Sequence, residues 1–156
     1  MKLIHCADLH LDSNLTGNLT SKQAKERRAE LLVTFQKMIT YANENDIHHI
    51  LISGDLYDKK NISATARNVF LSAVTCNPDI IFYYLKGNHD AGNLFIGMNN
   101  IPDNLKLFNT EWTKYRVTSE KDNNTIVISG IELTADNFDI IYNSLILDNN
   151  CFNIVM

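Results

Sequence analysis

The chain has 156 residues, 45% of them hydrophobic and 21% charged, and 18 acidic against 14 basic residues give a formal net charge of −4. This length allows one domain with a proper core, and the acidic balance does not indicate non-specific binding to nucleic acid, although bound divalent ions would reverse the local sign. The start has no signal-peptide pattern, no window approaches a membrane span, and the three cysteines show no metal-ligand spacing. We therefore expect a cytoplasmic protein with reduced, buried thiols.

The chain begins with a short predicted strand that leads into a long helix. The strand covers about residues 2–6, and the helix runs from an N-cap at Ser21, with no capping-box Glu in place, to about residue 45. The apolar stripe of this helix consists of Leu31, Phe35, Met38, Ile39 and Ala42. A strand–helix–strand order of this kind predicts parallel pairing of the strands.

A second and a third strand follow. The apolar run at residues 50–52 stops at a turn signal, which predicts a strand buried on both faces. A second helix is expected from its N-cap at Ser63 to about Cys76, and a third strand over residues 80–85. The order of elements is therefore strand, helix, strand, helix, strand, which is typical of an α/β fold.

The second half of the chain changes character. Further strands are expected at residues 105–108, 115–119 and 125–132. The polar reversal at 121–124 joins the last two of these as a hairpin. A helix is expected over residues 137–147, with an apolar side made of Phe138, Ile140, Ile141 and Leu145. The final run, 152–156, has the character of a buried strand.

Each of the first three strands ends in polar residues that can hold a metal ion. Asp8 and His10 are separated by one residue, so in extended backbone both would point to the same side and could share one ion. Asp55 follows the second strand, and Asn88 and His89 follow the third. Each motif has a plainer alternative, because Asp8 or Asp55 could cap a turn, His10 could pack, and Gly-Asn is an ordinary turn. The three matched strand ends together favour a shared site at the carboxyl edge of the sheet.

These motifs resemble those of the calcineurin-like metallophosphoesterases. The motifs that carry the resemblance are Asp8-Leu9-His10, Gly54-Asp55-Leu56-Tyr57-Asp58 and Gly87-Asn88-His89-Asp90. The runs 4–13 and 28–32 are closer still to the Mre11/SbcD-type branch of DNA repair exonucleases, in particular to its bacterial YhaO-like members. The resemblance implies an α/β fold in which mixed sheets form a sandwich flanked by helices, in four layers α/β/β/α. It also implies a metal-dependent phosphodiesterase that acts on DNA as an exonuclease or endonuclease.

The resemblance also implies roles for individual residues. Asp8 and His10 would hold the first of two divalent ions, Asp55 would bridge both, and Asn88 would hold the second. Oxygen and imidazole ligands suit Mn²⁺, and two ions roughly 3.5–4 Å apart can activate water and stabilise an in-line displacement. His89 would protonate the leaving alkoxide, with its ring oriented by Asp58 or Asp90. The implied partners are DNA ends as substrate and an SMC-like ATPase subunit for the full-length protein, with no membrane. A homodimer stays open.

Other polar residues lie near the motifs in the sequence. His5 is expected to pack beneath the site, whereas Asp12 and Tyr57 either support the site or are ordinary loop residues. His48 and His49 precede the second strand and are expected to be surface or structural residues.

The sequence departs from the family pattern after the third motif. The family completes its metal cage with later histidines, and no histidine follows His89 here. We therefore expect residues 1–156 to be the N-terminal part of a nuclease domain that lacks the last strands and histidine motifs, with a weak second ion and little or no activity. Two alternatives stay open: a phosphoesterase that acts on nucleotides or phosphoproteins, and a non-catalytic metal-binding or assembly module.

Overall fold

The computed structural model describes residues 1–15, 17–58, 62–90, 95, 100–119 and 124–156. These residues form two compact units, one of Lys2–Lys106 and one of Met1 together with Leu107–Met156. Residues 121–123 of the predicted hairpin turn lie outside the described residues. None of the helices in the described part of the chain is both long and apolar enough to cross a membrane.

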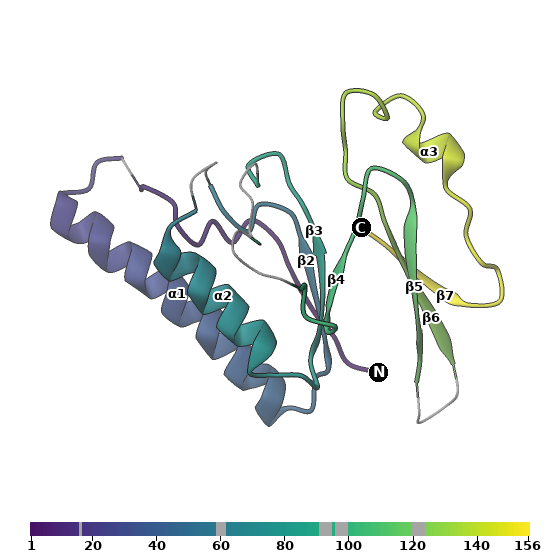
Figure 1. Cartoon of the computed structure of the whole chain (residues 1–156), viewed down its shortest axis with the longest axis horizontal. Coiled ribbons are helices and arrows are strands. Elements are labelled where there is room, and N and C mark those ends of the chain that lie inside the picture. Colours follow the sequence, from purple (N-terminus) through teal and green to yellow (C-terminus); the bar gives the residue numbers. More distant parts are fainter. Residues whose placement is uncertain (16, 59–61, 91–94, 96–99, 120–123) are drawn as a thin grey trace. The chain divides into compact units, whose positions relative to one another are not determined.

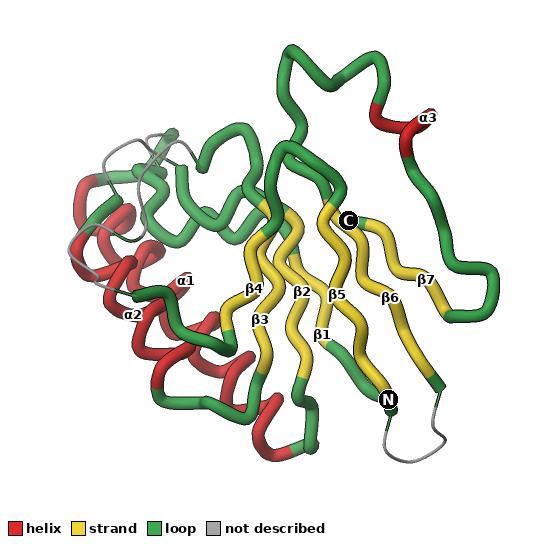
Figure 2. Tube along the Cα trace, turned by 45° about the vertical axis from the view of Figure 1, so that its right-hand side comes forward, coloured by secondary structure: helices red, strands yellow, loops and turns green. Residues whose placement is uncertain are grey.

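A four-stranded sheet and two helices build the first unit (Figure 1). The strands are β1 (Ile4–Cys6), β2 (His49–Ser53), β3 (Ile81–Leu85) and β4 (Leu105–Leu107), in the order β1-β2-β3-β4. β1 pairs with β2 and β2 with β3, both in parallel. The helices α1 (Ser21–Glu44) and α2 (Ala64–Thr75) cover one face of this sheet (Figure 2). The predicted strand–helix–strand–helix–strand order and its parallel pairing are confirmed.

The predicted start of α1 at a Ser21 cap is wrong by one residue. Thr20 is the N-cap, and its hydroxyl accepts from Gln23 N at 3.3 Å. The Gln23 side chain accepts in turn from Thr20 N at 2.9 Å, so the capping box that seemed to be missing is present. The reason is that glutamine closes this box as glutamate does, at a position counted from Thr20 rather than from Ser21.

The core of this unit lies between the helices and the central strand. Its members include Phe35, Ile39 and Ala42 from α1, Ala66, Phe70 and Val74 from α2, and Ile50 and Ile52 from β2. The Phe70 ring contacts the rings of Phe35 and Phe82, with centroids 6.0 and 6.3 Å apart. Residues 50–52 are at most 1% exposed, which confirms a strand buried on both faces. A strand fixed so firmly presents its carboxyl end in one defined position.

The second unit holds a three-stranded mixed sheet. Its strands are β5 (Thr113–Thr118), β6 (Thr125–Gly130) and β7 (Phe152–Val155), in the order β5-β6-β7. β5 and β6 are antiparallel, as the predicted hairpin requires, and β6 and β7 are parallel. Residues alternate between half-buried and exposed along β5, which confirms its solvated face. The mixed α/β class is thus confirmed, and the stacking of the sheets in four layers stays a prediction.

The predicted helix over residues 137–147 is wrong for most of its length. Only α3 (Ile141–Ser144) is helical, and Phe138 and Ile140 are 61% and 59% exposed. The Asn137 side chain explains the difference, because it accepts from Thr134 N at 2.8 Å and donates to two loop carbonyls, those of Thr110 and Glu132. An amide that satisfies loop backbone in this way competes with the helix that the apolar spacing predicts.

The final strand is present, but its predicted burial is wrong. β7 is an edge strand of its sheet in the described part of the chain, and Phe152 and Val155 are 68% and 47% exposed. An uncharged run of apolar residues predicts a strand but does not distinguish a central strand from an edge strand.

Candidate metal centre

Three loops meet at the carboxyl edge of the parallel strands β1, β2 and β3. Asp8 N donates to Gly54 O at 3.2 Å, and His10 N donates to Asp55 O at 2.9 Å. On the other side, Gly54 N donates to Leu85 O at 2.9 Å. Because the three strands run in the same direction, these backbone bonds hold all three polar motifs at one edge of the sheet.

Three potential metal ligands converge at this edge. Asp8, His10 and Asp55 each offer one ligand atom, and these atoms all lie within 4.8 Å of one another. The His10 Nε2 atom lies 4.0 Å from Asp8 Oδ1. Two carboxylates and an imidazole form a donor set that suits a divalent cation such as Mn²⁺. The sequence-based expectation that these side chains converge is therefore met by the geometry.

The expectation of extended backbone at Asp8 and His10 is wrong. Asp8, His10 and Asp55 have φ angles of +54°, +44° and +49°, and Gly54 has +85°. Left-handed backbone costs an L-residue roughly 1 kcal/mol or more, and is tolerated best by glycine, asparagine and aspartate. The hydrogen bonds to the neighbouring strand ends hold these residues in that conformation.

Gly87 leaves the space that Asp55 occupies. A Cβ atom at Gly87 would lie 2.1 Å from Asp55 Oδ1 and 2.5 Å from Asp55 N. His89 N donates to the same Asp55 oxygen at 3.0 Å. The turn after β3 therefore orients the carboxylate of Asp55 through a close approach that only glycine permits.

Asp58 lies between two imidazole rings. Its Oδ1 atom is 3.4 Å from His10 Nδ1 and 3.4 Å from His89 Nδ1. The two rings meet edge to face, with centroids 5.6 Å apart. A carboxylate that faces the far nitrogen of an imidazole is the usual way in which a metal-ligating histidine is oriented. Of the two carboxylates proposed to orient His89, Asp58 is the one in contact with its ring.

Asp90 has a different role from the one considered for it. It is 5% exposed, and its Oδ1 accepts from Tyr57 N at 2.8 Å. Its Oδ2 accepts from Gly87 N at 2.9 Å and from Leu56 N at 3.2 Å. Asp90 therefore ties the loop after β2 to the loop after β3 and fixes the backbone on which Asp55 and His89 stand.

Asp12 supports the site from the loop after β1. Its two carboxylate oxygens accept from Asp58 N and Ser63 N, each at 3.1 Å. It is 6% exposed, so these bonds are shielded from water. Of the two roles left open for Asp12, the contacts favour support of the site.

Asn88 is exposed and stands between Gly87 and His89 in the same turn. No hydrogen bond of its side chain is recorded with another described residue. The structure therefore places Asn88 at the carboxyl edge of the sheet, where the carboxylates and imidazole of Asp8, His10 and Asp55 converge. Its predicted part in holding a second ion stays a prediction.

Three further residues near the site do not supply metal ligands. His5 is exposed and bonds Ser53 Oγ at 2.9 Å, so the expectation that it packs beneath the site is wrong. Burial raises the pKa of the Cys6 thiol to about 11, so it stays protonated near neutral pH. Burial likewise raises the pKa of Tyr57, whose side chain belongs to the core. The expectation of buried thiols is wrong, because Cys76 is exposed and Cys6 and Cys151 are half-buried. All three cysteines are free.

Ser13 was not identified from the sequence. Its hydroxyl donates to Asp58 Oδ2 at 2.8 Å, so it belongs to the network around the imidazoles. Serine is common in loops, and nothing in its spacing from the second motif indicates this contact. Only the fold brings residues 13 and 58 together.

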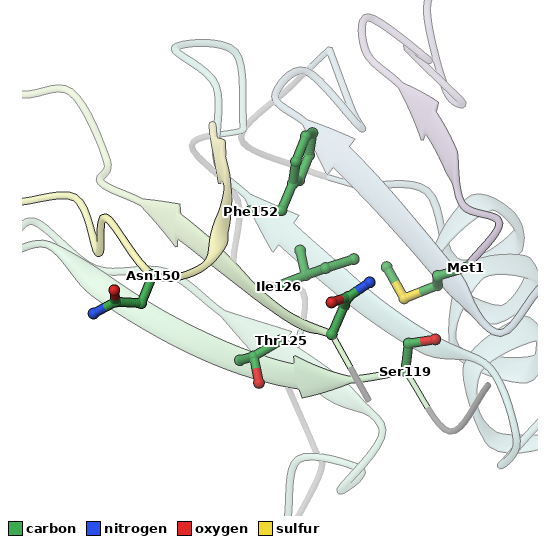
Figure 3. A pocket seen from close by; sticks show the side chains of 7 residues that line it. Met1, Ser119, Thr125, Ile126, Asn150 and Phe152 are labelled. Carbon is green, nitrogen blue, oxygen red and sulfur yellow. The ribbon is translucent and has the colours of Figure 1, made fainter. Parts of the chain in front are cut away.

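A cavity of about 280 Å³ lies in the second unit (Figure 3). Its lining consists of Met1, Ser119, Asn124, Thr125, Ile126, Asn150 and Phe152. None of these residues carries a carboxylate or an imidazole, so this cavity offers no ligand set for a divalent cation.

The comparison with protein families agrees with the geometry at the sheet edge. The calcineurin-like phosphoesterase family matches residues 1–154. The chain therefore belongs to the calcineurin-like phosphoesterases, which hydrolyse phosphoesters with the help of divalent metal ions. A search of curated proteins gives no significant match.

The residues at the sheet edge fit the metal that this family uses. Asp8, His10 and Asp55 offer two hard carboxylates and one imidazole within 4.8 Å. The buried Nδ1 atom of His10 has no hydrogen bond of good geometry within the described residues, and the Asp58 carboxylate faces it. Its Nε2 atom points toward the carboxylate of Asp8, as a ligating nitrogen would.

Proposed function

We propose that this chain is a metal-dependent phosphodiesterase of the Mre11/SbcD type that acts on DNA ends. The observation that carries the proposal is the convergence of Asp8, His10 and Asp55 at one edge of the sheet. The runs 4–13 and 28–32, with their resemblance to that branch, support the choice of DNA as substrate.

In this proposal Asp8, His10 and Asp55 would hold the first divalent ion, and Asp55 and Asn88 would hold the second. The proposed metal is Mn²⁺, because carboxylate, amide and imidazole ligands suit it better than they suit sulfur-loving ions. When bound, such ions supply positive charge that stabilises the phosphoryl oxygens and activates water for attack.

The residues of the chain perform the remaining steps. His89, whose side chain is 48% exposed, stands where a substrate can reach it. Its doubly protonated ring donates the Nε2 proton to the leaving oxygen and becomes the neutral Nδ1–H form. Asp58 holds the ring of His89 through Nδ1, which leaves Nε2 to face the substrate. Asp90 and Gly87 fix the turn that carries His89, so that its ring need not be ordered at the moment of reaction.

The second ion has fewer ligands from this chain than the first. No histidine follows His89, so Asp55 and Asn88 are its proposed ligands. We expect Mn²⁺ titrations to show one tighter and one weaker site. A phosphodiesterase rate that rises over the concentration range of the weaker site would agree with a need for both ions.

The test of the proposal is Mn²⁺ binding by isothermal titration calorimetry, followed by cleavage of duplex DNA labelled at its 3′ ends. Asp55→Asn should abolish the tighter site, because it removes a charged ligand that the turn after β3 orients. The control is Asp79→Asn, the same change at an exposed residue before β3, at the opposite end of that strand. A wild-type chain that binds no Mn²⁺, or an Asp55→Asn variant that binds it normally, would remove the proposal.

The second candidate is a phosphoesterase that acts on nucleotides or phosphoproteins. The net charge of −4 favours it, because proteins that bind duplex DNA usually present a basic face. Competition separates the two candidates. Duplex DNA should inhibit hydrolysis of bis-p-nitrophenyl phosphate if DNA is the substrate, whereas nucleotides or a phosphopeptide should inhibit it in the alternative.

The proposal also includes protein partners. Nucleases of this branch act as homodimers with an SMC-like ATPase, and we propose the ATPase as a partner of the full-length protein and a homodimer for this chain. Light scattering on the chain, with and without Mn²⁺, tests the homodimer. A chain that binds Mn²⁺ but binds neither duplex DNA nor a phosphoester would instead be a metal-binding or assembly module.

A further inference from the structure

Ser13 lies in the loop after β1 and has no part in the proposed function. It belongs to a closed ring of contacts with His10 and with Asp58 of the loop after β2. Ser13 N donates to His10 O at 3.0 Å, which closes a turn over residues 10–13. The hydroxyl of Ser13 donates to Asp58 Oδ2 at 2.8 Å. The other oxygen, Asp58 Oδ1, lies 3.4 Å from His10 Nδ1. Ser13, Asp58 and His10 are therefore each in contact with the other two.

The two oxygens of Asp58 have separate neighbours. Oδ2 accepts from Ser13, whereas Oδ1 faces the Nδ1 atoms of both His10 and His89. The terminal torsion of an aspartate is soft and two-fold, so a carboxylate without other partners would not hold this division. Asp12 accepts from Asp58 N at 3.1 Å, so the same turn holds the backbone of Asp58 as well.

The position of the Asp58 carboxylate decides where a neutral imidazole carries its proton. A carboxylate that faces Nδ1 keeps the proton there and leaves the lone pair on Nε2. For His10 this is the nitrogen that lies 4.0 Å from Asp8 Oδ1, on the side of the metal ligands. The opposite tautomer would direct an N–H group at the cation.

We infer that Ser13 is a positioning residue that acts through Asp58. Its hydroxyl fixes the carboxylate so that one oxygen faces both imidazoles and holds His10 and His89 in the Nδ1–H tautomer. Its importance for metal binding rests on the proposed function, but the tautomers themselves are properties of the metal-free chain.

Nitrogen-15 NMR of the histidine side chains in the metal-free chain, at a pH where the imidazoles are neutral, tests this directly. Ser13→Ala should move His10 and His89 toward the Nε2–H tautomer, and Ser13→Thr, which restores a hydroxyl, should return them. Ser72→Ala on the exposed face of α2 is the matched control and should change neither ring. Wild-type tautomers in Ser13→Ala would overturn the inference.

A second variant keeps the test decisive if Ser13→Ala does not fold. Asp58→Asn should also move both rings, because an amide cannot accept from two N–H groups and from Ser13 in the same way. If both rings keep the Nδ1–H form in Asp58→Asn, the inference fails. A merely structural role for Ser13 would change the stability of the chain but not these tautomers.

Metal affinity provides the other readout. Loss of a group that orients a metal-ligating histidine typically weakens binding by about tenfold or more, and we expect that loss in Ser13→Ala and its recovery in Ser13→Thr. Unchanged Mn²⁺ affinity in Ser13→Ala would overturn the positioning role. If the wild-type chain binds no Mn²⁺, the proposed function fails, whereas the tautomers still decide the role of Ser13.

Discussion

Asp8, His10 and Asp55 hold a left-handed backbone at the point where their side chains converge. Each such residue costs free energy, and the bonds from Asp8 N and His10 N to the loop after β2 offset that cost. The ligands are therefore oriented before any metal binds. A site prepared in this way loses little conformational entropy on binding, which favours tight binding of the first ion.

Substitution of Gly87 tests whether the ligands are oriented before the metal binds. In Gly87→Ala the new Cβ would lie 2.1 Å from Asp55 Oδ1, so the carboxylate must move. We expect Mn²⁺ affinity to fall by about tenfold or more, measured by calorimetry. Gly17→Ala is the matched control, because a Cβ there meets nothing within 4 Å. Equal affinities of Gly87→Ala and the wild type would show that the turn does not orient Asp55.

The buried His49 at the start of β2 makes stability depend on pH. Burial, and then the neighbouring His48, lower the pKa of His49 from its ordinary value of 6.5. The unfolded chain therefore takes up a proton near pH 6.5 that the folded chain takes up only at lower pH. The contribution of the neutral ring is complete above pH 6.5 and is lost as the pH falls below it.

His49→Gln removes this dependence on pH. Urea midpoints measured between about pH 7.5 and about pH 5 should fall less steeply in the variant than in the wild type, because it lacks the titrating ring. Parallel slopes for the two proteins would contradict the assignment.

The identity of the site residues could be predicted from the sequence, but their backbone conformation could not. Asp8, His10 and Asp55 could be named because they follow apolar runs that end abruptly. The assumption of extended backbone failed, because a period of two does not apply beyond the end of a strand. The partner of Ser13 was not predictable, because a hydrogen bond between residues 13 and 58 depends on tertiary structure.

At the scale of elements, the strength of the local signal decided what could be predicted. β2 and α2 were found because a continuous apolar run and a serine cap are strong signals. The helix predicted over residues 137–147 is mostly absent, because the Asn137 side chain bonds the loop backbone instead. β7 was found as a strand, but its place at an edge depends on its neighbours in the sheet.

The capping box of α1 offers a test at this scale. Thr20→Ala removes the bond from Gln23 N and should lower the free energy of unfolding by about 1 kcal/mol. Thr40→Ala is the matched control, because Thr40 lies at an exposed position inside the same helix. There alanine should raise the free energy by about 0.5 kcal/mol through its higher helix propensity. Urea denaturation followed by circular dichroism distinguishes the two, and effects of the same sign would contradict the cap.

At the scale of the whole molecule, exposed apolar residues gather in one segment of the sequence. Of the thirteen large hydrophobic residues recorded as exposed in the described part of the chain, eight lie within residues 133–155. They are Leu133, Phe138, Ile140, Tyr142, Ile146, Leu147, Phe152 and Val155. An apolar edge strand such as β7 is a template for pairing with another chain, so self-association is expected at high concentration.

A lysine on β7 should reduce this self-association. Val155→Lys places a charge on the edge strand, and charged edges discourage pairing between sheets. Val33→Lys on α1 is the matched control, because Val33 and Val155 are 46% and 47% exposed. Static light scattering over a concentration series should show a lower average mass for Val155→Lys only. The same mass for both variants would contradict a role for the edge.

Anomalous scattering from crystals of the chain soaked in Mn²⁺ tests the proposed metal centre most directly. We expect a strong peak in contact with Asp8, His10 and Asp55, and a weaker one on the side of Asn88. The absence of a peak among those three side chains, or peaks only elsewhere on the molecule, would contradict it.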